Sequence, residues 1–240
     1  MNLICDIPSI ASVSTKAAMP GADENPTTLV QGTPEWLAMR CGKVTASRIN
    51  DLVARTKTGW SASRGHYMAE LLAERLTGQP AGAYESAAMQ WGRAHEDQAR
   101  RAYSFRYDRS VRTIGFVPHP RIALSGSSPD GCVGEDGLLE IKAPNTATHL
   151  DVLVSRDVPG KYLPQMLWQM ACTGRAWCDF VSYDPRLPEE LRLVVIRVKR
   201  DEAAIADLEH EVQIFLGELQ VRIDDVYAVA RAAGRGEARS

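Results

Sequence analysis

No apolar run in the sequence reaches about 18 residues, the length that a membrane-spanning helix requires, so a membrane span is excluded. The N-terminus has no basic segment leading into a long apolar stretch, and a signal peptide is therefore not expected. Cysteine is scarce: the five cysteines include no Cys-X-X-Cys pair, and their number is odd. A disulfide-rich secreted scaffold is therefore excluded, and free thiols in a reducing cytoplasm are predicted.

A strong net charge is also missing, because 28 Lys and Arg face 30 Asp and Glu and leave a net charge of −2. The chain as a whole therefore has no positive electrostatic field of the kind that would indicate a nucleic-acid partner. The charge is uneven, however, and the segment from Arg93 to Arg121 holds seven arginines interleaved with Tyr103, Phe105 and Tyr107. This local excess could face phosphates or could form a solvated helix face, and the sequence favours neither.

With 240 residues, 45% of them apolar and 24% charged, the chain is long enough for one domain with a sizeable core and too short for two. Residues 1–30 are rich in Ser, Ala, Pro, Thr and Gly without sustained periodicity, which predicts a flexible lead-in. A single domain is predicted over residues 31–232, and residues 233–240 are expected to form a flexible tail.

Helical and strand-like patterns alternate along the domain and predict an α/β (α+β) fold. Helices are predicted at 34–40, from 44 to about 53, at 61–77, 87–107 and 163–173, and along a long amphipathic stretch from Ile205 to Val226 that is expected to pack on the sheet. Strands are predicted at 112–117, in a hairpin within 123–144, and at 177–183 and 191–198. Residues 145–161 are predicted to form a polar loop with at most a helical turn, and Leu76 is expected on the buried face of its helix.

The stretch from Ala123 to Pro144 carries most of the chemistry. An apolar run reaches a turn with Asp130, and the chain then crosses a Gly-rich bend into an apolar strand. Since residues two apart on a strand share a face, Glu140 and Lys142 point the same way while Ile141 points into the core. Two carboxylates and an ammonium at this point can hold Mg²⁺ and place a proton acceptor beside its water.

Each of these acids also has a simpler interpretation. Asp130 could be a turn former, and Glu140 with Lys142 could form an exposed ion pair that contributes little. Glu96 shares a helical stripe with small residues, so it is either an exposed charge or a group that small neighbours admit to a site. Two charged groups on one face of an apolar strand are costly unless they face a site, which favours the functional interpretation.

The pattern Pro129-Asp130, a short hairpin and Glu140-Ile141-Lys142 resembles the PD-(D/E)XK nuclease motif. With the whole chain in view, the resemblance narrows to the family of phage lambda exonuclease and its YqaJ-type relatives. Five blocks carry it, namely Trp36–Ser47, Gln90–Glu96, Ser128–Gly131, Leu139–Pro144, and Tyr162 to Gln169 followed by Tyr183–Arg186. Their order and spacing are more specific than the nuclease motif alone.

The resemblance implies a restriction-endonuclease-like core in which helices flank a central mixed β-sheet. It implies a 5′→3′ double-strand DNA exonuclease that releases 5′-mononucleotides and leaves 3′ single-stranded overhangs for phage-type homologous recombination. The family works with Mg²⁺, here expected as two ions with Mn²⁺ as a substitute, and with a single-strand annealing protein. A homotrimeric ring around DNA ends, and a place in the cytoplasm of a bacterial host as a phage or prophage product, are further expectations.

The resemblance also assigns roles to individual residues. It places the metal site at three carboxylates and one backbone carbonyl, those of Glu96, Asp130, Glu140 and Ile141. Lys142 resembles the residue that positions or deprotonates the attacking water, and Gln165 resembles a helix glutamine near that water. Gln165 could equally be a satisfied amide on a helix surface.

Arg40, Ser47 and Ser128 resemble the family's pocket for the terminal 5′-phosphate. The chemistry fits, since a guanidinium fork suits phosphate and hydroxyls add neutral hydrogen bonds. Arg40 could instead offset a helix dipole, and Ser47 could simply be a helix cap. The chain departs from lambda exonuclease in one respect, because Pro120 or Arg121 stands where that protein has an acidic residue, so an auxiliary cation there is not supported.

Two other functions stay open. One is a site-specific or structure-specific endonuclease on the same fold, which would degrade a covalently closed circle. The other is a catalytically silent DNA-binding module, which the presence of Asp130, Glu140 and Lys142 together disfavours. Relatives that bind an iron–sulfur cluster need four clustered cysteines, whereas the cysteines of this chain are scattered.

Overall fold

The computed structural model describes residues 29–81 and 86–237. Nearly all of the lead-in predicted over residues 1–30, and residues 238–240 of the predicted tail, lie outside the described residues. Within the described ranges, no helix is long and apolar enough to cross a membrane. The described cysteines (Cys41, Cys132, Cys172 and Cys178) are free thiols, as predicted.

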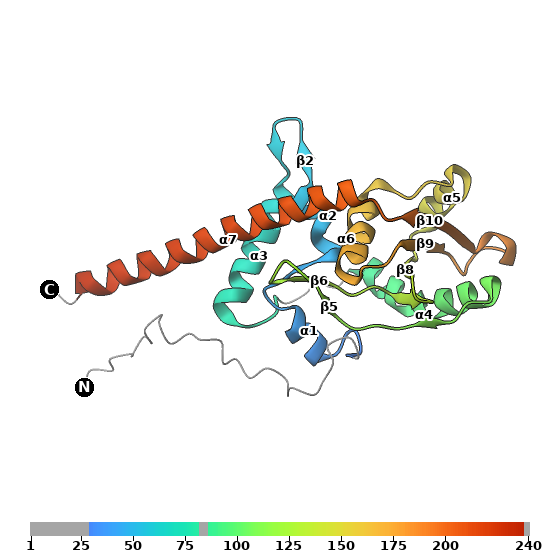
Figure 1. Ribbon diagram of the computed structural model, residues 1–240, viewed down its shortest axis with the longest axis horizontal. Helices are drawn as coiled ribbons and strands as arrows, with labels where there is room; N and C mark the ends of the chain where they lie inside the picture. The colour runs from blue at the N-terminus through green and yellow to red at the C-terminus, as the bar shows by residue number, and fades with distance from the viewer. Residues whose placement is uncertain (1–28, 82–85, 238–240) are drawn as a thin grey trace.

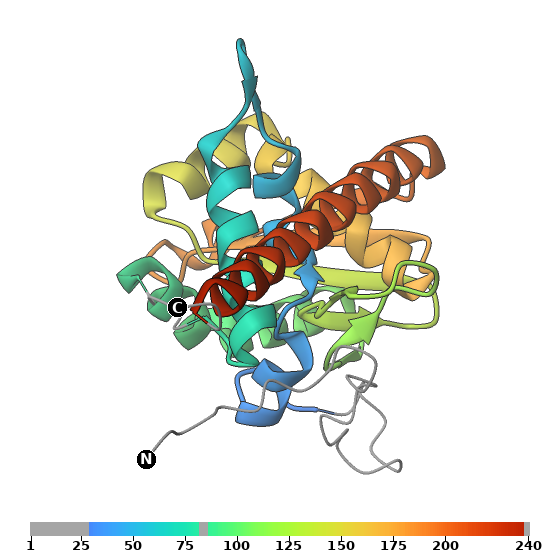
Figure 2. The ribbon, with the colours of Figure 1, turned by 90° about the vertical axis from the view of Figure 1, so that its left-hand side faces the viewer.

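Helices and strands alternate along the chain. The helices are α1 (Pro34–Arg40), α2 (Ile49–Val53), α3 (Ala62–Thr77), α4 (Ala87–Tyr107), α5 (Thr146–Ser155), α6 (Leu163–Thr173) and α7 (Glu202–Glu237). The strands are β1 (Val44–Thr45), β2 (Arg55–Thr56), β3 (Gly59–Trp60), β4 (Val111–Arg112), β5 (Val117–Pro118), β6 (Ser125–Ser127), β7 (Gly131–Val133), β8 (Gly137–Lys142), β9 (Trp177–Tyr183) and β10 (Leu193–Lys199). Strands β2 and β3 form a hairpin that stands away from the body (Figures 1 and 2).

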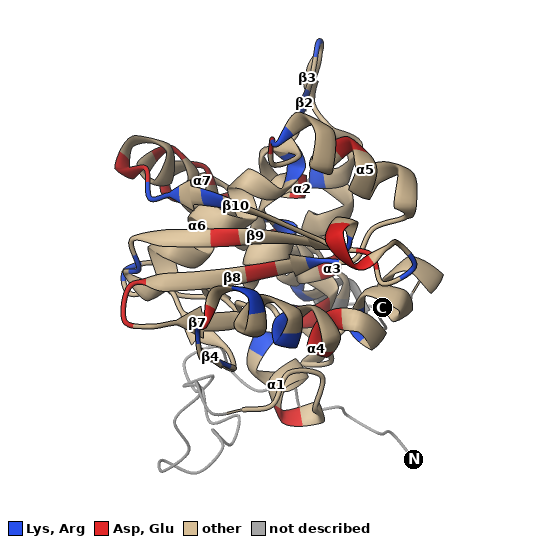
Figure 3. Ribbon diagram, turned by 90° about the vertical axis from the view of Figure 1, so that its right-hand side faces the viewer, with Lys and Arg blue, Asp and Glu red and all other residues tan. Residues whose placement is uncertain are grey.

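A mixed five-stranded sheet in the order β10-β9-β8-β7-β4 carries the predicted hairpin (Figure 3). Strands β8 and β9 run parallel, and the other neighbours run antiparallel. The β7–β8 hairpin pairs Gly131 with Leu139, which brings Asp130, the residue before β7, beside Glu140. The mixed sheet flanked by helices confirms the predicted fold class.

Helices cover both faces of this sheet. On one face, α4 packs Ala99 and Tyr103 into a core that includes Ile141 of β8. On the other face, α6 packs Met166 and its neighbours against β8 and β9. Because alternate residues of a strand face opposite sides, Glu140 lies on the α6 side of the sheet.

A smaller sheet in the order β1-β6-β5 leads the chain into the hairpin. Strands β1 and β6 are parallel, with Thr45 beside Gly126. Both strands therefore end on the same side, where β1 continues to Ser47 and β6 continues to Ser128. This geometry brings two segments of the predicted phosphate pocket, more than 70 positions apart in the numbering, to one edge.

Helix α7 packs mainly on α2, α3 and α6, so the expectation that it covers the sheet holds only for Ile205 at its start. The side chains that it buries among these helices are Leu208, Val212, Phe215 and Leu219. Beyond Ile223, apolar side chains such as Val226 and Val229 are exposed, and the helix projects from the body (Figures 1 and 2). The helix continues to Glu237, although a flexible tail was expected from residue 233.

Two segments predicted as single elements are divided in the structure. Val44 and Thr45 were expected to open a helix, but they form the buried strand β1, because pairing with β6 outweighs the helical spacing that follows. The predicted strand 112–117 is split between β4 in the main sheet and β5 in the small sheet. Sequence periodicity does not reveal that the two halves pair with different partners.

Residues 145–161 were predicted as a loop, whereas α5 occupies Thr146–Ser155. The side chain of Asn145 accepts the N–H of Thr148 and so caps the helix, which buries His149 and Val152. The prediction for Leu76 was also wrong, since its side chain is 37% exposed near the end of α3. The helices 87–107 and 163–173 and the strand 177–183 were predicted at their observed bounds.

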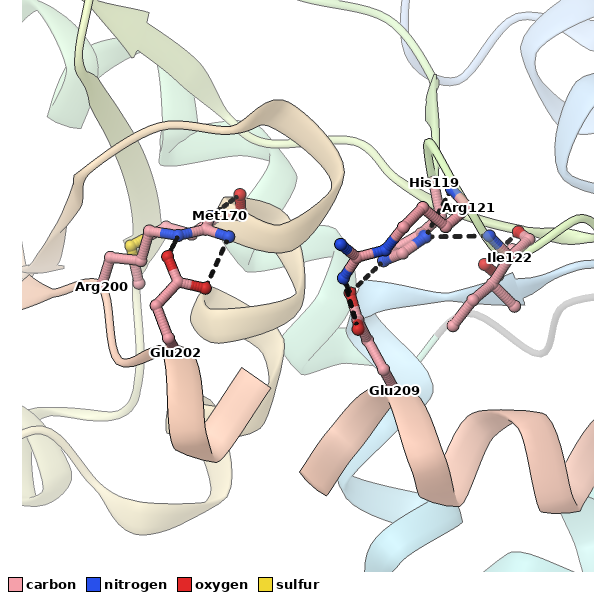
Figure 4. Close-up of polar contacts among 8 residues, drawn as sticks. His119, Arg121, Ile122, Met170, Arg200, Glu202 and Glu209 are labelled. Atoms are coloured by element: carbon pink, nitrogen blue, oxygen red, sulfur yellow. Dashed lines mark hydrogen bonds and ion pairs between the residues drawn. The ribbon is translucent and has the colours of Figure 1, made fainter. Parts of the chain in front are cut away.

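His119 connects the turn between β5 and β6 with α7 (Figure 4). Its Nδ1 accepts hydrogen bonds from the backbone N–H groups of Arg121 and Ile122, at 3.2 and 3.1 Å. Its Nε2 lies 3.1 Å from Oε1 of Glu209 on α7. The Arg121 guanidinium also donates to both oxygens of Glu209 at 2.6 Å, so one carboxylate fixes α7 to the turn that enters β6.

We expect His119 to make folding stability depend on pH. Burial against the Trp168 ring lowers the pKa of His119 below its ordinary value of 6.5, although the charge of Glu209 opposes this effect. The unfolded chain therefore binds the proton more readily than the folded protein. The stability that neutral His119 contributes is present above about pH 6.5 and is lost as the pH falls through the folded pKa.

The variant His119→Asn tests this expectation, because an Asn oxygen can accept the same backbone N–H groups and does not titrate. Urea denaturation at about pH 7 and about pH 5 measures the free energy of unfolding on both sides of the ordinary His pKa. Acid should reduce this free energy more in the wild-type protein than in the variant. Equal losses in the two proteins would contradict the role of His119.

Candidate active site

The carboxylate of Glu140 is completely buried in the middle of β8. The side-chain amides of Gln165 and Gln169, one turn apart on α6, donate to its two oxygens at 2.6 and 2.5 Å. Lys142 forms an ion pair with the same carboxylate. A buried carboxylate is costly unless its oxygens find donors, and α6 supplies them because its two glutamines are four residues apart.

Lys142 is held as an ammonium ion at the edge of this cluster. Its side chain is partly exposed, and Nζ lies 5.3 Å from the centre of the Tyr162 ring. Burial acts to lower the pKa of Lys142, but the charges of Glu140 and Asp130 outweigh burial and raise it above its usual value. A lysine in this state donates hydrogen bonds, which suits the positioning of a water molecule or of a phosphate oxygen.

Asp130 lies beside Glu140, where the chain passes from β6 to β7. Its Oδ2 accepts the N–H of Ile141 at 2.6 Å, so the register of the hairpin fixes the carboxylate. Burial, and then the charges of Glu140 and Glu96, raise the pKa of Asp130 well above its usual value. The three acids therefore lie near enough to repel one another.

Glu96 reaches this cluster from α4, on the other side of the sheet. Burial raises the pKa of Glu96, and the charge of Glu140 adds to this effect while that of Arg100 opposes it. Arg100, one turn later on α4, forms an ion pair with Glu96 and donates from Nε to the carbonyl of Asp130 at 3.2 Å. Arg100 thus ties α4 to the turn that carries Asp130.

The donor set fits a hard divalent cation, because carboxylate oxygens are the ligands that such a cation prefers and neighbouring acids gain from an added positive charge. In the structure each carboxylate accepts from a protein donor instead, from Arg100, from the N–H of Ile141, or from Lys142 and the two glutamines. Within the described ranges, no three His, Cys, Asp or Glu side chains are gathered closely enough to hold an ion as they stand. A bound cation would therefore compete with Arg100 and Lys142 for these oxygens.

Two residues of the predicted phosphate pocket, Arg40 and Ser128, are brought together by Trp36. The guanidinium of Arg40 lies 4.1 Å from the centre of the Trp36 ring, and Nε1 of Trp36 donates to Oγ of Ser128 at 3.0 Å. Burial lowers the pKa of Arg40 below its usual value. Ser47 is exposed at the same end of the parallel pair β1–β6, and no hydrogen bond joins it to Ser128 within the described residues.

Sequence reasoning assigned no role to three residues that hold the site together, namely Arg100, Gln169 and Trp36, although the last two lie in the blocks that carry the resemblance. The first two leave a signal, since Arg100 stands four residues after Glu96 and Gln169 four residues after Gln165. The contact of Trp36 with Ser128 spans 92 positions, and no local pattern could have revealed it.

Comparison with known proteins gives the following findings. A model of the YqaJ-like viral recombinase domain matches residues 35–176. An alkaline exonuclease from Laribacter hongkongensis (LHK-Exo) is 47% identical with a TM-score of 0.78, over 84% of this chain and 100% of that chain. The structure of LHK-Exo in complex with dAMP gives the same values.

A more distant structure, a phage related exonuclease from Haemophilus somnus 129PT, is 14% identical with a TM-score of 0.64, over 77% of this chain and 96% of that chain. At this level of identity, the likeness concerns the fold alone. Comparison with curated proteins finds no match.

Proposed function

The chain belongs to the YqaJ-like viral recombinase domain family, and we propose that it is a divalent-metal-dependent exonuclease that degrades double-stranded DNA in the 5′→3′ direction. Its products are 5′-mononucleotides and 3′ single-stranded overhangs that serve phage-type homologous recombination. The family match over residues 35–176 confirms the resemblance, which the sequence blocks from Trp36 to Gln169 carry.

The observation that carries the proposal is the placing of Asp130 beside Glu140 in the β7–β8 hairpin, with Lys142 paired to Glu140 and with Arg100 joining Glu96 to the carbonyl of Asp130. Burial and the charges of neighbouring acids raise the pKa of both Asp130 and Glu96, which is typical of acids gathered at a functional site. Two relatives support the choice of reaction, since LHK-Exo is described as an alkaline exonuclease and its structure with dAMP places a nucleotide on such a protein.

We assign Glu96, Asp130, Glu140 and the carbonyl of Ile141 to the binding of two Mg²⁺ ions, for which Mn²⁺ substitutes. When bound, such ions supply the positive charge that activates water and stabilises the phosphate being cleaved. Lys142 donates hydrogen bonds to the attacking water or to a phosphate oxygen. Gln165, held against Glu140, orients that carboxylate and helps to position the water.

The pocket of Arg40, Ser47 and Ser128 binds the terminal 5′-phosphate. The Trp36 ring fixes the plane of the Arg40 guanidinium, and Ser128 stands two residues before Asp130. The pocket is therefore tied by a two-residue segment to the site of hydrolysis. Because the pocket binds a terminal phosphate beside the site of hydrolysis, cleavage depends on a DNA end. We further propose a homotrimer around the DNA and a single-strand annealing protein as partner.

Lys142→Ala is expected to abolish hydrolysis, because it removes the donor that positions the water. The rate on linear duplex with Mg²⁺ should fall by at least about 100-fold, while DNA binding in the presence of EDTA should change little. The matched control is Lys199→Ala, an exposed lysine on β10. A near-normal rate for Lys142→Ala would refute the assignment, and degradation of a covalently closed circle by the wild-type protein would favour an endonuclease.

Arg40→Lys is expected to erase the preference for a 5′-phosphate over a 5′-hydroxyl end. The lysine keeps the positive charge but loses the planar fork and its stacking on Trp36. The preference is the ratio of initial rates on two duplexes that differ only in the terminal phosphate, and Arg222→Lys on α7 is the control. An unchanged ratio in Arg40→Lys would show that the pocket lies elsewhere.

A further inference from the structure

Two strand pairs that belong to different sheets follow one common register. Strand β4 pairs with β7 in the main sheet (Figure 3), and β5 pairs with β6 in the small sheet (Figure 1). Both pairs are antiparallel, and both join the segments 111–118 and 126–133. Counting inward from the innermost pair of either ladder leads to the same result, which is that an unbroken ladder would set Ile114 opposite Asp130.

The ladder is open at this point. Within the described chain, no backbone hydrogen bond joins residues 113–116 to residues 128–130. The carbonyls on the two sides of the opening therefore need donors from elsewhere, because a backbone carbonyl away from water rarely stays unpaired. The opening coincides with the turn that carries Asp130, one of the candidate site's acids.

The side chain of Gln31 bridges the two sides of the opening. Its Nε2 donates to the carbonyl of Ile114 at 3.0 Å and to the carbonyl of Pro129 at 2.9 Å. Because both partners are carbonyl oxygens, only the NH₂ end of the amide can face them, and both of its hydrogens are used. One side chain thus replaces backbone pairing where the ladder is interrupted.

Gln31 is one of three side chains that hold this turn from outside. Trp36 donates to Oγ of Ser128, and Arg100 donates to the carbonyl of Asp130. Gln31 bonds to the residue between these two and also to the opposite side of the opening, so it fixes the distance between the two sides. A wider or narrower opening would move the backbone of Asp130.

The position of this backbone decides what the Asp130 carboxylate reaches. Its Oδ2 accepts the N–H of Ile141 on β8 at 2.6 Å. Strand β7 begins only at Gly131, so pairing between β7 and β8 holds Asp130 from one side alone. The contact on the other side comes from Gln31 through the neighbouring carbonyl of Pro129.

We propose that Gln31 is a positioning residue for Asp130. Its amide holds the interrupted ladder at the separation that places the Asp130 carboxylate on the N–H of Ile141, where the carboxylate is available to a cation. Gln31 precedes the residues that the family model matches, and it also precedes the first block of the resemblance. The statement about the cation rests on the proposed function, whereas the placement of Asp130 does not.

Hydrogen exchange of the Ile141 amide in the metal-free protein reports the placement of Asp130, because the Asp130 carboxylate accepts this N–H. Gln31→Met keeps a similar side-chain length but removes both donors. Relative to the amide of Val181 on the neighbouring strand β9, the Ile141 amide should exchange about tenfold faster in this variant than in the wild-type protein. The matched control Gln220→Met removes an amide hydrogen bond on the exposed surface of α7 and should leave this ratio unchanged.

Calorimetric titration with Mn²⁺ tests the consequence for the cation. Gln31→Met should raise the Kd for Mn²⁺ about tenfold, as the loss of a group that orients a metal ligand does. The rate on linear duplex at saturating Mn²⁺ should stay near that of the wild-type protein. A purely structural role would lower the free energy of unfolding and leave the Kd of the folded protein unchanged. If Gln31→Met does not fold, Gln31→Asn takes its place, since its amide is one methylene group shorter and cannot reach both carbonyls.

Equal acceleration of exchange at Ile141 and Val181 would overturn the proposal, because it would show a loss of global stability alone. An Ile141 amide that exchanges as in the wild-type protein, or an unchanged Kd for Mn²⁺, would overturn it as well. The exchange measurement needs no metal. Absence of Mn²⁺ binding from the wild-type protein would therefore refute the proposed cation site and leave the placement of Asp130 by Gln31 to be decided by exchange.

Discussion

A fully buried carboxylate constrains the structure more than any other group in it. Glu140 lies in the middle of β8, where an ionised group survives only if donors surround it and the charge of a neighbouring acid is balanced. Three local features meet this condition. The two glutamines on α6 are spaced so that both donate to Glu140, strand alternation turns Lys142 to the same face, and the hairpin register sets Asp130 alongside. An apolar residue at position 140 would pack on α6 without needing any of these donors.

The second feature of the site is the short path along the chain from the proposed phosphate pocket to the acids. Strand β6 ends at Ser127, and the next three residues include Ser128 of the proposed pocket and Asp130 of the acidic cluster. Gln31 fixes the intervening residue by donating to the carbonyl of Pro129 at 2.9 Å. The proposed phosphate pocket and the acidic cluster are therefore separated by a stretch of backbone that cannot change its length.

The sequence predicted the parts of this arrangement that depend on local spacing. The hairpin, the shared face of Glu140 and Lys142, and the helices that carry Glu96 and Gln165 all follow from periods of two and of about 3.6 residues. Sequence alone could not show which strand β1 joins, because the parallel partner of Val44 and Thr45 lies some 80 positions away. Nor could it show that α7 rests on other helices, since an apolar stripe does not reveal what covers it.

The same limit applies to charge. From the sequence alone, phosphate contact and a solvated helix face were equally supported for the arginines after Arg93, because a count of charges does not say which are paired. The structure separates them: Arg100 and Arg121 bind acids, while Arg101, Arg106 and Arg112 remain exposed. The partner of each charge is a property of the tertiary structure. It separates Arg100, which holds the turn of Asp130 in place, from the arginines that are exposed.

Calorimetric titration of the metal-free protein with Mn²⁺, without DNA, tests most directly whether the three acids form a cation site. The account predicts saturable binding that is lost in Asp130→Asn and in Glu140→Gln and is retained in Glu135→Gln, an exposed acid in the turn of the same hairpin. Binding that persists in Asp130→Asn and Glu140→Gln, or its absence from the wild-type protein, would contradict it.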